Sequence, residues 1–293
     1  MARLTSPGGS RPVQAPVVGL LLGGVVAAAA YWRRALTLDG ALAASVVGGI
    51  VFGRGGLPAA GSLLTFFGSS NLLSRLGEGR KQAMPLAQAK GSRRDAWQVL
   101  ANGGVATLAI ALGQPDAFIG ALAGASADTW ATELGLLTSH APRLITTLRE
   151  VPAGTSGGIT PVGLAASLGG AVIVGSSWAW LTGHRRAVLV AGVAGMSASL
   201  ADSLLGATVQ ALYHCPRCDL VTETPIHGAC GQPTALVRGS ARITNDVVNV
   251  LATLVGAALG LLLRTPNAAK HVRGGANVRR RVGWGRVLSV APQ

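Results

Sequence analysis

The sequence has few charged residues. Asp, Glu, Lys and Arg together make up 12% of its 293 residues, whereas a soluble domain usually carries about 25%. Hydrophobic residues make up 49% of the chain. The chain has too few polar residues to cover the surface of a globule in water. The composition therefore excludes an ordinary soluble domain and favours lipid as the solvent.

Acidic residues are especially scarce. Eleven Asp and Glu stand against 25 Lys and Arg, which gives a net charge of +14 and a pI near 11.5. The basic residues lie in short clusters between long apolar runs, and not on one polar domain, so no nucleic-acid partner is expected. Membrane lipids and phosphorylated substrates are the expected partners.

The N-terminal segment lacks a small-residue cleavage site. Arg3 and Arg11 precede an apolar run, as in a secretory signal peptide, but no cleavage site closes that run and further apolar runs follow. We therefore expect a retained first helix.

Long apolar runs recur along the chain. A helix needs nearly 20 apolar residues to cross a hydrocarbon core of about 30 Å. The sequence therefore predicts an all-α, polytopic membrane helix bundle with about eight spans, near residues 13–31, 36–53, 57–73, 96–113, 116–137, 159–182, 187–212 and 243–263.

The second and third spans are the weakest of the eight. Arg54, Gly55, Gly56 and Pro58 leave them a very short connection, so they form one hairpin or a partly re-entrant segment, and seven spans remain an alternative. We assign residues 1–264 to the transmembrane domain, with an extramembrane loop at 214–242, and residues 265–293 to a basic tail that we expect to be disordered.

Basic residues predict the orientation. With the N-terminus outside, thirteen basic residues fall in the cytoplasmic loops and three fall opposite, namely Arg54, Arg185 and Arg186. This predicts an inner, plasma-membrane protein whose functional loops are cytoplasmic. The basic tail beyond Arg264 would then lie outside. Either one weak span is miscounted, or the charges of the loops determine the orientation despite those of the tail.

The chain contains a weak internal repeat. Ala127-Asp128-Thr129 recurs as Ala201-Asp202-Ser203, and Ile159-Thr160 recurs as Ile243-Thr244. This spacing predicts helix-loop-helix units that bring their polar loops to one face of the membrane.

Three acidic residues lie in or at the ends of apolar helices. A central Asp costs about 3 kcal/mol on insertion scales, so Asp128, Glu133 and Asp202 predict a functional site. Carboxylates that face a polar cavity suit Mg²⁺, which takes one or two carboxylates together with substrate phosphates. In the alternative reading the helices end early and these acids are in water.

Basic and amide residues suggest phosphate binding. The loop from Gly77 to Asp95 carries cations suited to charge-assisted hydrogen bonds, although ordinary positive-inside charge explains them equally well. Asn102 follows inside an apolar helix, where its amide needs polar partners. The candidate cations are Lys81, Lys90, Arg93 and Arg94.

A segment of small residues, VPAGTSGGITP, follows Arg149 and precedes a helix. Helix N-termini of this kind can hold anions, so Arg149 and the segment are candidates for phosphate binding, with a plain flexible loop as the alternative. No GK[ST] is present, which excludes a Walker A loop. The candidates are Thr155, Ser156, Gly157 and Gly158, with a second polar cluster at Asn245, Asp246 and Asn249.

Cysteine is rare, and all three cysteines lie within 16 residues. Cys215, Cys218, His227 and Cys230 offer four ligands of the kind that Zn²⁺ takes in small structural sites. His214 is a competing ligand. A Cys215–Cys218 redox pair and unliganded thiols are the other readings.

These motifs together resemble the integral membrane family known as domain of unknown function 92, which includes transmembrane protein 19 and a plant phytyl-phosphate kinase. The resemblance covers about residues 35–263 and rests on RRDAWQVLANGG, ADTWATELG, VPAGTSGGITPVG, ADSLLGATVQ, CPRC and ITNDVVN, in that order.

The resemblance implies a membrane-embedded lipid phosphotransferase. Its expected reaction converts an isoprenoid monophosphate into the diphosphate with CTP or another nucleoside triphosphate and Mg²⁺. A transporter of anionic or phosphorylated solutes and a non-catalytic membrane scaffold are the alternatives. Neither the lipid, the nucleotide nor the oligomeric state follows from the sequence.

Overall fold

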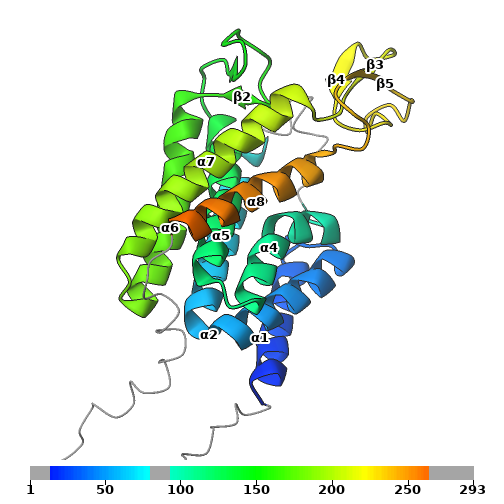
Figure 1. The fold of residues 1–293 in the computed structure, drawn as a ribbon. Coiled ribbons are helices and arrows are strands. Elements are labelled where there is room, and N and C mark those ends of the chain that lie inside the picture. The colour runs from blue at the N-terminus through cyan, green and yellow to red at the C-terminus, as the bar shows by residue number, and fades with distance from the viewer. Residues whose placement is uncertain (1–13, 80–92, 264–293) are drawn as a thin grey trace, which may run out of the picture.

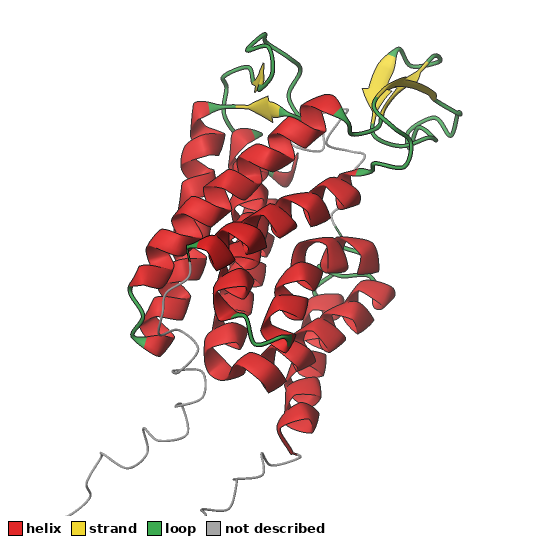
Figure 2. Cartoon of the chain, in the orientation of Figure 1, coloured by secondary structure: helices red, strands yellow, loops and turns green. Residues whose placement is uncertain are grey.

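The structure is a computed structural model, and it describes residues 14–79 and 93–263 of the chain. Helices make up most of the described residues (Figures 1 and 2). The helices are α1 (Gln14–Trp32), α2 (Leu38–Arg75), α4 (Ala96–Ala111), α5 (Pro115–Gly135), α6 (Pro161–Thr182), α7 (Arg186–Thr208) and α8 (Asn245–Leu262).

Helix α2 reverses direction at Gly56. This residue has φ 62° and ψ −156°, a conformation open to glycine but not to residues with a Cβ. A straight helix of 38 residues would be about 57 Å long. Yet Arg75 at the end of α2 donates from Nη2 to the carbonyl of Arg33, just before its start, at 3.1 Å. The two helices expected at 36–53 and 57–73 are therefore halves of one broken element.

Helix α5 is the centre of the bundle. It contacts α4, α6, α7 and α8, and every residue from Pro115 to Ala127 is buried. Small residues allow these close approaches: a Cβ on Gly120 would lie 2.1 Å from the carbonyl oxygen of Gly256 in α8. Gly120, Gly256 and Gly260 thus serve close packing between α5 and α8, as small residues do in other membrane bundles.

Apolar side chains also cover the outside of the bundle. Trp180 is 85% exposed and Leu262 is 79% exposed, which suits a surface in contact with lipid. Among the described residues, α2, α6, α7 and α8 are long and apolar enough to cross a membrane, while α4 is apolar but shorter. The count of eight crossings stays a prediction.

The connections that carry the candidate motifs gather at one end of the bundle (Figure 1). We call this the loop end; it comprises residues 33–37, 76–79, 93–95, 136–160 and 209–244. A two-stranded sheet, β1 (Arg143–Leu144) with β2 (Gly158–Ile159), lies there. A second sheet lies beside it, with strand order β4-β3-β5, formed by β3 (Leu212–Cys215), β4 (Leu220–Thr222) and β5 (Ala235–Arg238).

These strands were not expected from the sequence. The span expected at 187–212 ends as helix α7 at Thr208, because Leu212–Cys215 pairs with β4 and β5 instead of continuing the helix. The helix therefore ends before the loop expected at 214–242 begins, and residues 212–213 belong to β3. The fold remains a helix bundle with small sheets at its loop end.

The two halves of the internal repeat occupy equivalent places. Asp128 and Asp202 both lie in helices that run toward the loop end. Thr160 and Thr244 are both N-caps of the helices that leave it, since their hydroxyls accept from the amides of Gly163 and Val247. The repeat therefore places like residues at like depths in the bundle.

Candidate functional site

A polar cavity of about 470 Å³ lies at the loop end. Its walls come from the ends of α2, α4, α5, α7 and α8 and from the loop before α6. It brings together most of the residues that the sequence singled out: Arg94, Asn102, Asp128, Glu133, Thr155, Ser156, Gly157, Gly158, Asp202, Asn245 and Asn249.

The last turns of α5 place two acids on the cavity. Asp128 and Glu133 are both half-buried. Glu133 accepts a hydrogen bond from the hydroxyl of Ser74 in α2 at 2.5 Å. One turn away, the indole of Trp130 donates to Ser69 in α2 at 3.2 Å. These contacts fix the end of α5 against the returning half of α2 and hold the acids in place.

Further side chains with oxygen atoms reach the cavity from three other helices. Asp202 projects from α7, Asn245 and Asn249 lie one turn apart on α8, and Asn102 lies on α4. Within the described residues, the acids do not form a compact three-carboxylate cluster. This donor set fits Mg²⁺, because that ion takes one or two carboxylates and completes its shell with waters and phosphate oxygens.

Arg94 is held at the cavity by its own backbone. Its amide donates to the carbonyl of Ala35 at 3.0 Å, and its carbonyl accepts from the amide of Thr37 at 3.1 Å. Burial lowers the pKa of the Arg94 guanidinium, and the nearby Glu133 carboxylate acts in the opposite direction. The backbone of Arg94 is thus fixed, and its guanidinium lies near the Glu133 carboxylate.

The small-residue loop at 154–158 forms a wall of the cavity. The amides of Thr155 and Gly158 donate within the loop, to the carbonyls of Pro152 and Thr155. Gly157 has φ 85° and packs against α7, where a Cβ would lie 2.5 Å from that of Ala207. The hydroxyl of Ser156 donates to Glu223 and accepts from Gln210. Many of the loop's hydrogen bonds therefore stabilise the conformation of the loop.

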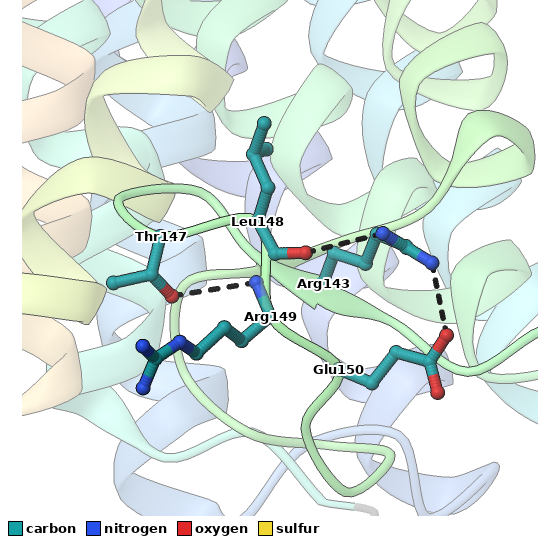
Figure 3. A network of polar contacts seen from close by, with 5 residues as sticks. All are labelled: Arg143, Thr147, Leu148, Arg149 and Glu150. Carbon is teal, nitrogen blue, oxygen red and sulfur yellow. Dashed lines mark hydrogen bonds and ion pairs between the residues drawn. The ribbon is translucent and has the colours of Figure 1, made fainter.

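Three predicted site residues lie away from the cavity. Arg93 donates twice to the carbonyl of Leu36 and covers the ring of Tyr31. Arg149 is exposed, and its guanidinium points away from the Arg143–Glu150 ion pair of 2.9 Å that closes the same loop (Figure 3). Asp246 lies outside the cavity lining, and Lys81 and Lys90 lie outside the described residues.

The four predicted zinc ligands converge. Their ligand atoms all lie within 4.8 Å of one another, and within the described residues no other group of His, Cys, Asp and Glu is arranged in this way. Hydrogen bonding to Cys230 is the main cause that raises the pKa of the Cys218 thiol to about 11. His214, the competing ligand, instead contacts Asp219 at 2.9 Å.

An apolar cavity of about 600 Å³ adjoins the polar one. Side chains of α1, α2 and α4 form most of its wall, with Trp180 and Leu181 from α6. Arg94, Gln98 and Asn102 line both cavities. A polar compartment and an apolar compartment therefore meet along one side of α4.

Residues 21–257 match the protein family described as Integral membrane protein DUF92. The chain belongs to this family. It is 30% identical to Protein PGR of Arabidopsis thaliana over 272 residues, which cover 82% of this chain and 92% of that protein. It is 32% identical to the Uncharacterized membrane protein MJ0933 of Methanocaldococcus jannaschii over 253 residues, or 84% and 93% of the two chains. No solved structure matches it.

Family membership confirms the resemblance drawn from the sequence motifs. In this DUF92 protein all of those motifs except CPRC contribute residues to the lining of the polar cavity. Sequence reasoning missed Ser74 near the end of α2 and Glu78 just after that helix, and also His140 and Ser199. The signal for Ser74 was a serine in an apolar helix after Ser69-Ser70-Asn71. No comparable signal marked His140, because its place depends on the path of a loop.

Proposed function

We propose that this DUF92 protein is a membrane-embedded lipid phosphotransferase, and specifically an isoprenoid-monophosphate kinase that uses CTP or another nucleoside triphosphate with Mg²⁺. The observation that carries the proposal is the wall shared by the two cavities, at Arg94, Gln98 and Asn102. An amphipathic substrate needs this pairing, with room for an apolar chain beside a charged site for its phosphate.

The shared wall supports a division of roles. The isoprenoid chain occupies the apolar cavity between α1, α2 and α4, where its transfer from water is favourable. The monophosphate then lies at Arg94, whose guanidinium matches phosphate oxygens. Both cavity volumes, about 600 and 470 Å³, suit small-molecule ligands.

The carboxylates suit the metal of a phosphoryl transfer. Asp128 and Asp202 would hold Mg²⁺, with Asn245, Asn249 and Asn102 as neighbouring oxygen ligands. When bound, Mg²⁺ neutralises charge on the transferred phosphoryl group. Glu133 keeps Arg94 in place through their mutual attraction.

The proposed reaction needs no covalent enzyme intermediate. An oxygen of the substrate monophosphate attacks the γ-phosphorus of the nucleotide, and the bond from that phosphorus to the β–γ bridging oxygen breaks. The products are the isoprenoid diphosphate and the nucleoside diphosphate. The protein's part is to hold both phosphates close together and in line, and to exclude water.

The loop end is proposed to face the cytoplasm of a plasma-type inner membrane. Most basic residues of the described chain lie at that end, whereas Arg54, Arg185 and Arg186 lie at the other. The cytoplasm also supplies the nucleotide donor.

The deciding experiment is conversion of phytyl or geranylgeranyl monophosphate to the diphosphate by the purified protein in lipid, with Mg²⁺ and each nucleoside triphosphate in turn. We expect product with at least one nucleotide. No product with any isoprenoid phosphate and any nucleotide would refute the kinase. Uptake of the same phosphates into proteoliposomes would then support transport instead, and inactivity in both assays would favour a scaffold.

A further inference from the structure

The Cys/His cluster has the dimensions of a tetrahedral metal site. Zn–S bonds of about 2.3 Å and Zn–N bonds of about 2.0–2.1 Å give ligand separations of roughly 3.8 Å between sulfurs and 3.5 Å between sulfur and nitrogen. Cys215 Sγ and Cys230 Sγ are 3.6 Å apart, and His227 Nδ1 is 3.2 Å from Cys230 Sγ. The three cysteines are free. The donor set and its spacing both match Zn²⁺.

Two tight turns present these ligands. Cys215 ends β3 and pairs with Leu220, so the Cys-Pro-Arg-Cys turn between them carries Cys218. A second turn carries His227 and Cys230, and two backbone hydrogen bonds close it. The amide of His227 donates to the carbonyl of Gln232 at 2.9 Å, and the amide of Gly231 donates to the carbonyl of His227 at 2.8 Å. We call residues 212–238 the knuckle.

The knuckle has little core of its own. Ile226, Leu236 and Val237 are exposed, and Cys215 and His227 are among its few buried side chains. Structural zinc sites supply folding free energy in domains of this kind, because apolar burial alone is insufficient. An ion at this position would therefore determine whether the knuckle keeps its shape.

The knuckle contacts the loop at 154–158, which forms a wall of the polar cavity. Glu223, directly after β4, accepts a hydrogen bond from Ser156. Buried Gln210, just before β3, donates to the same hydroxyl at 3.1 Å. Arg238 at the end of β5 donates to the carbonyl of Gly206 in α7 at 2.9 Å. Glu223 and Gln210 thus reach the wall of the cavity through Ser156, and Arg238 ties the last strand of the second sheet to α7.

We propose that Cys215, Cys218, His227 and Cys230 bind one Zn²⁺, and that this ion fixes the loop at 154–158 by holding Glu223 and Gln210 against Ser156. The ion is structural and closed, with four protein ligands and no position for substrate. This proposal does not depend on the kinase assignment, because each part is measured without an activity assay.

The first part is tested by elemental analysis of the full-length protein in detergent, purified with reductant and without chelator. We expect about one zinc per chain in the wild type and in His214→Ala, and far less in His227→Ala. His214 is the matched control, since it is the other histidine of the knuckle and contacts Asp219 instead of the cluster. A zinc-free wild type that also fails to take up added ZnCl₂, or equal zinc in both variants, would overturn the site.

The second part is tested by hydrogen exchange on the wild type before and after zinc removal with a chelator. Amides of residues 151–160 should exchange about tenfold faster or more without zinc, and readdition of ZnCl₂ should reverse the change. Residues 116–127 of buried α5 should not change. Glu223→Ala, which removes the acceptor of the Ser156 hydroxyl, should retain zinc yet show faster exchange at 151–160. Unchanged exchange in both cases would refute the coupling and leave a zinc site without an effect on the cavity.

Discussion

Arg94→Gln removes the cation at the junction of the two cavities. Arg94 is the only Arg or Lys among the described residues that line the polar cavity, and it also borders the apolar one. Its backbone is fixed by hydrogen bonds to Ala35 and Thr37, which the substitution leaves intact. The variant therefore removes the guanidinium from a scaffold that should otherwise persist.

The expected loss follows from the value of a charge-assisted hydrogen bond. Such bonds contribute about 1.5–3 kcal/mol, and each 1.4 kcal/mol or so is a factor of ten, so kcat/KM for the isoprenoid monophosphate should fall about 10- to 150-fold. Arg94→Lys keeps the charge but not the fork of donors, and should recover part of the loss. Removing the positive charge also leaves Glu133 without its nearby cation, so some loss of thermal stability is expected.

Steady-state kinetics in lipid, with elution profile and melting temperature as checks of folding, measure this effect. Arg93→Gln is the matched control, because Arg93 is the neighbouring residue but donates to Leu36 and lies away from the cavity. It should lower stability by about 1 kcal/mol and leave kcat/KM unchanged. Full activity in Arg94→Gln, or equal losses in the two variants, would refute the reasoning.

The remaining predictions concern other parts of the structure. Asp128→Asn and Asp202→Asn should each lose about a hundredfold or more in kcat while still folding; full activity in both, in the same assay, would remove the metal assignment. Gly120→Ala should destabilise the bundle by about 1–3 kcal/mol, since its Cβ would meet a backbone oxygen of α8, whereas Gly68→Ala has open space and should be neutral or stabilising in thermal melts. Gly103→Leu fills part of the apolar cavity and should shift preference toward shorter isoprenoid chains in competition assays; an unchanged preference would count against that cavity as the chain site.

The acidic residues of the candidate site could be predicted from residue type alone. Asp128, Glu133 and Asp202 stood out because acids are costly in apolar helices, and all three line one cavity. Arg93 and Arg94 are adjacent and identical in type, so the sequence cannot distinguish their roles. In the structure, the bridge between Leu36 and Arg94 places Arg94 at the cavity, whereas Arg93 covers the ring of Tyr31. Charge in a loop does not show which side chain faces inward.

The sequence by itself determined that the chain is a membrane helix bundle, where most helices lie, which family it belongs to, and that four zinc-type ligands lie close together along the chain. Those features depend on composition, apolar run length and local spacing. Only the tertiary structure decided that α2 folds back at Gly56, that two cavities share Arg94, and that Glu223 reaches Ser156. Each of these features depends on packing between segments far apart in the chain, which short-range sequence patterns do not predict.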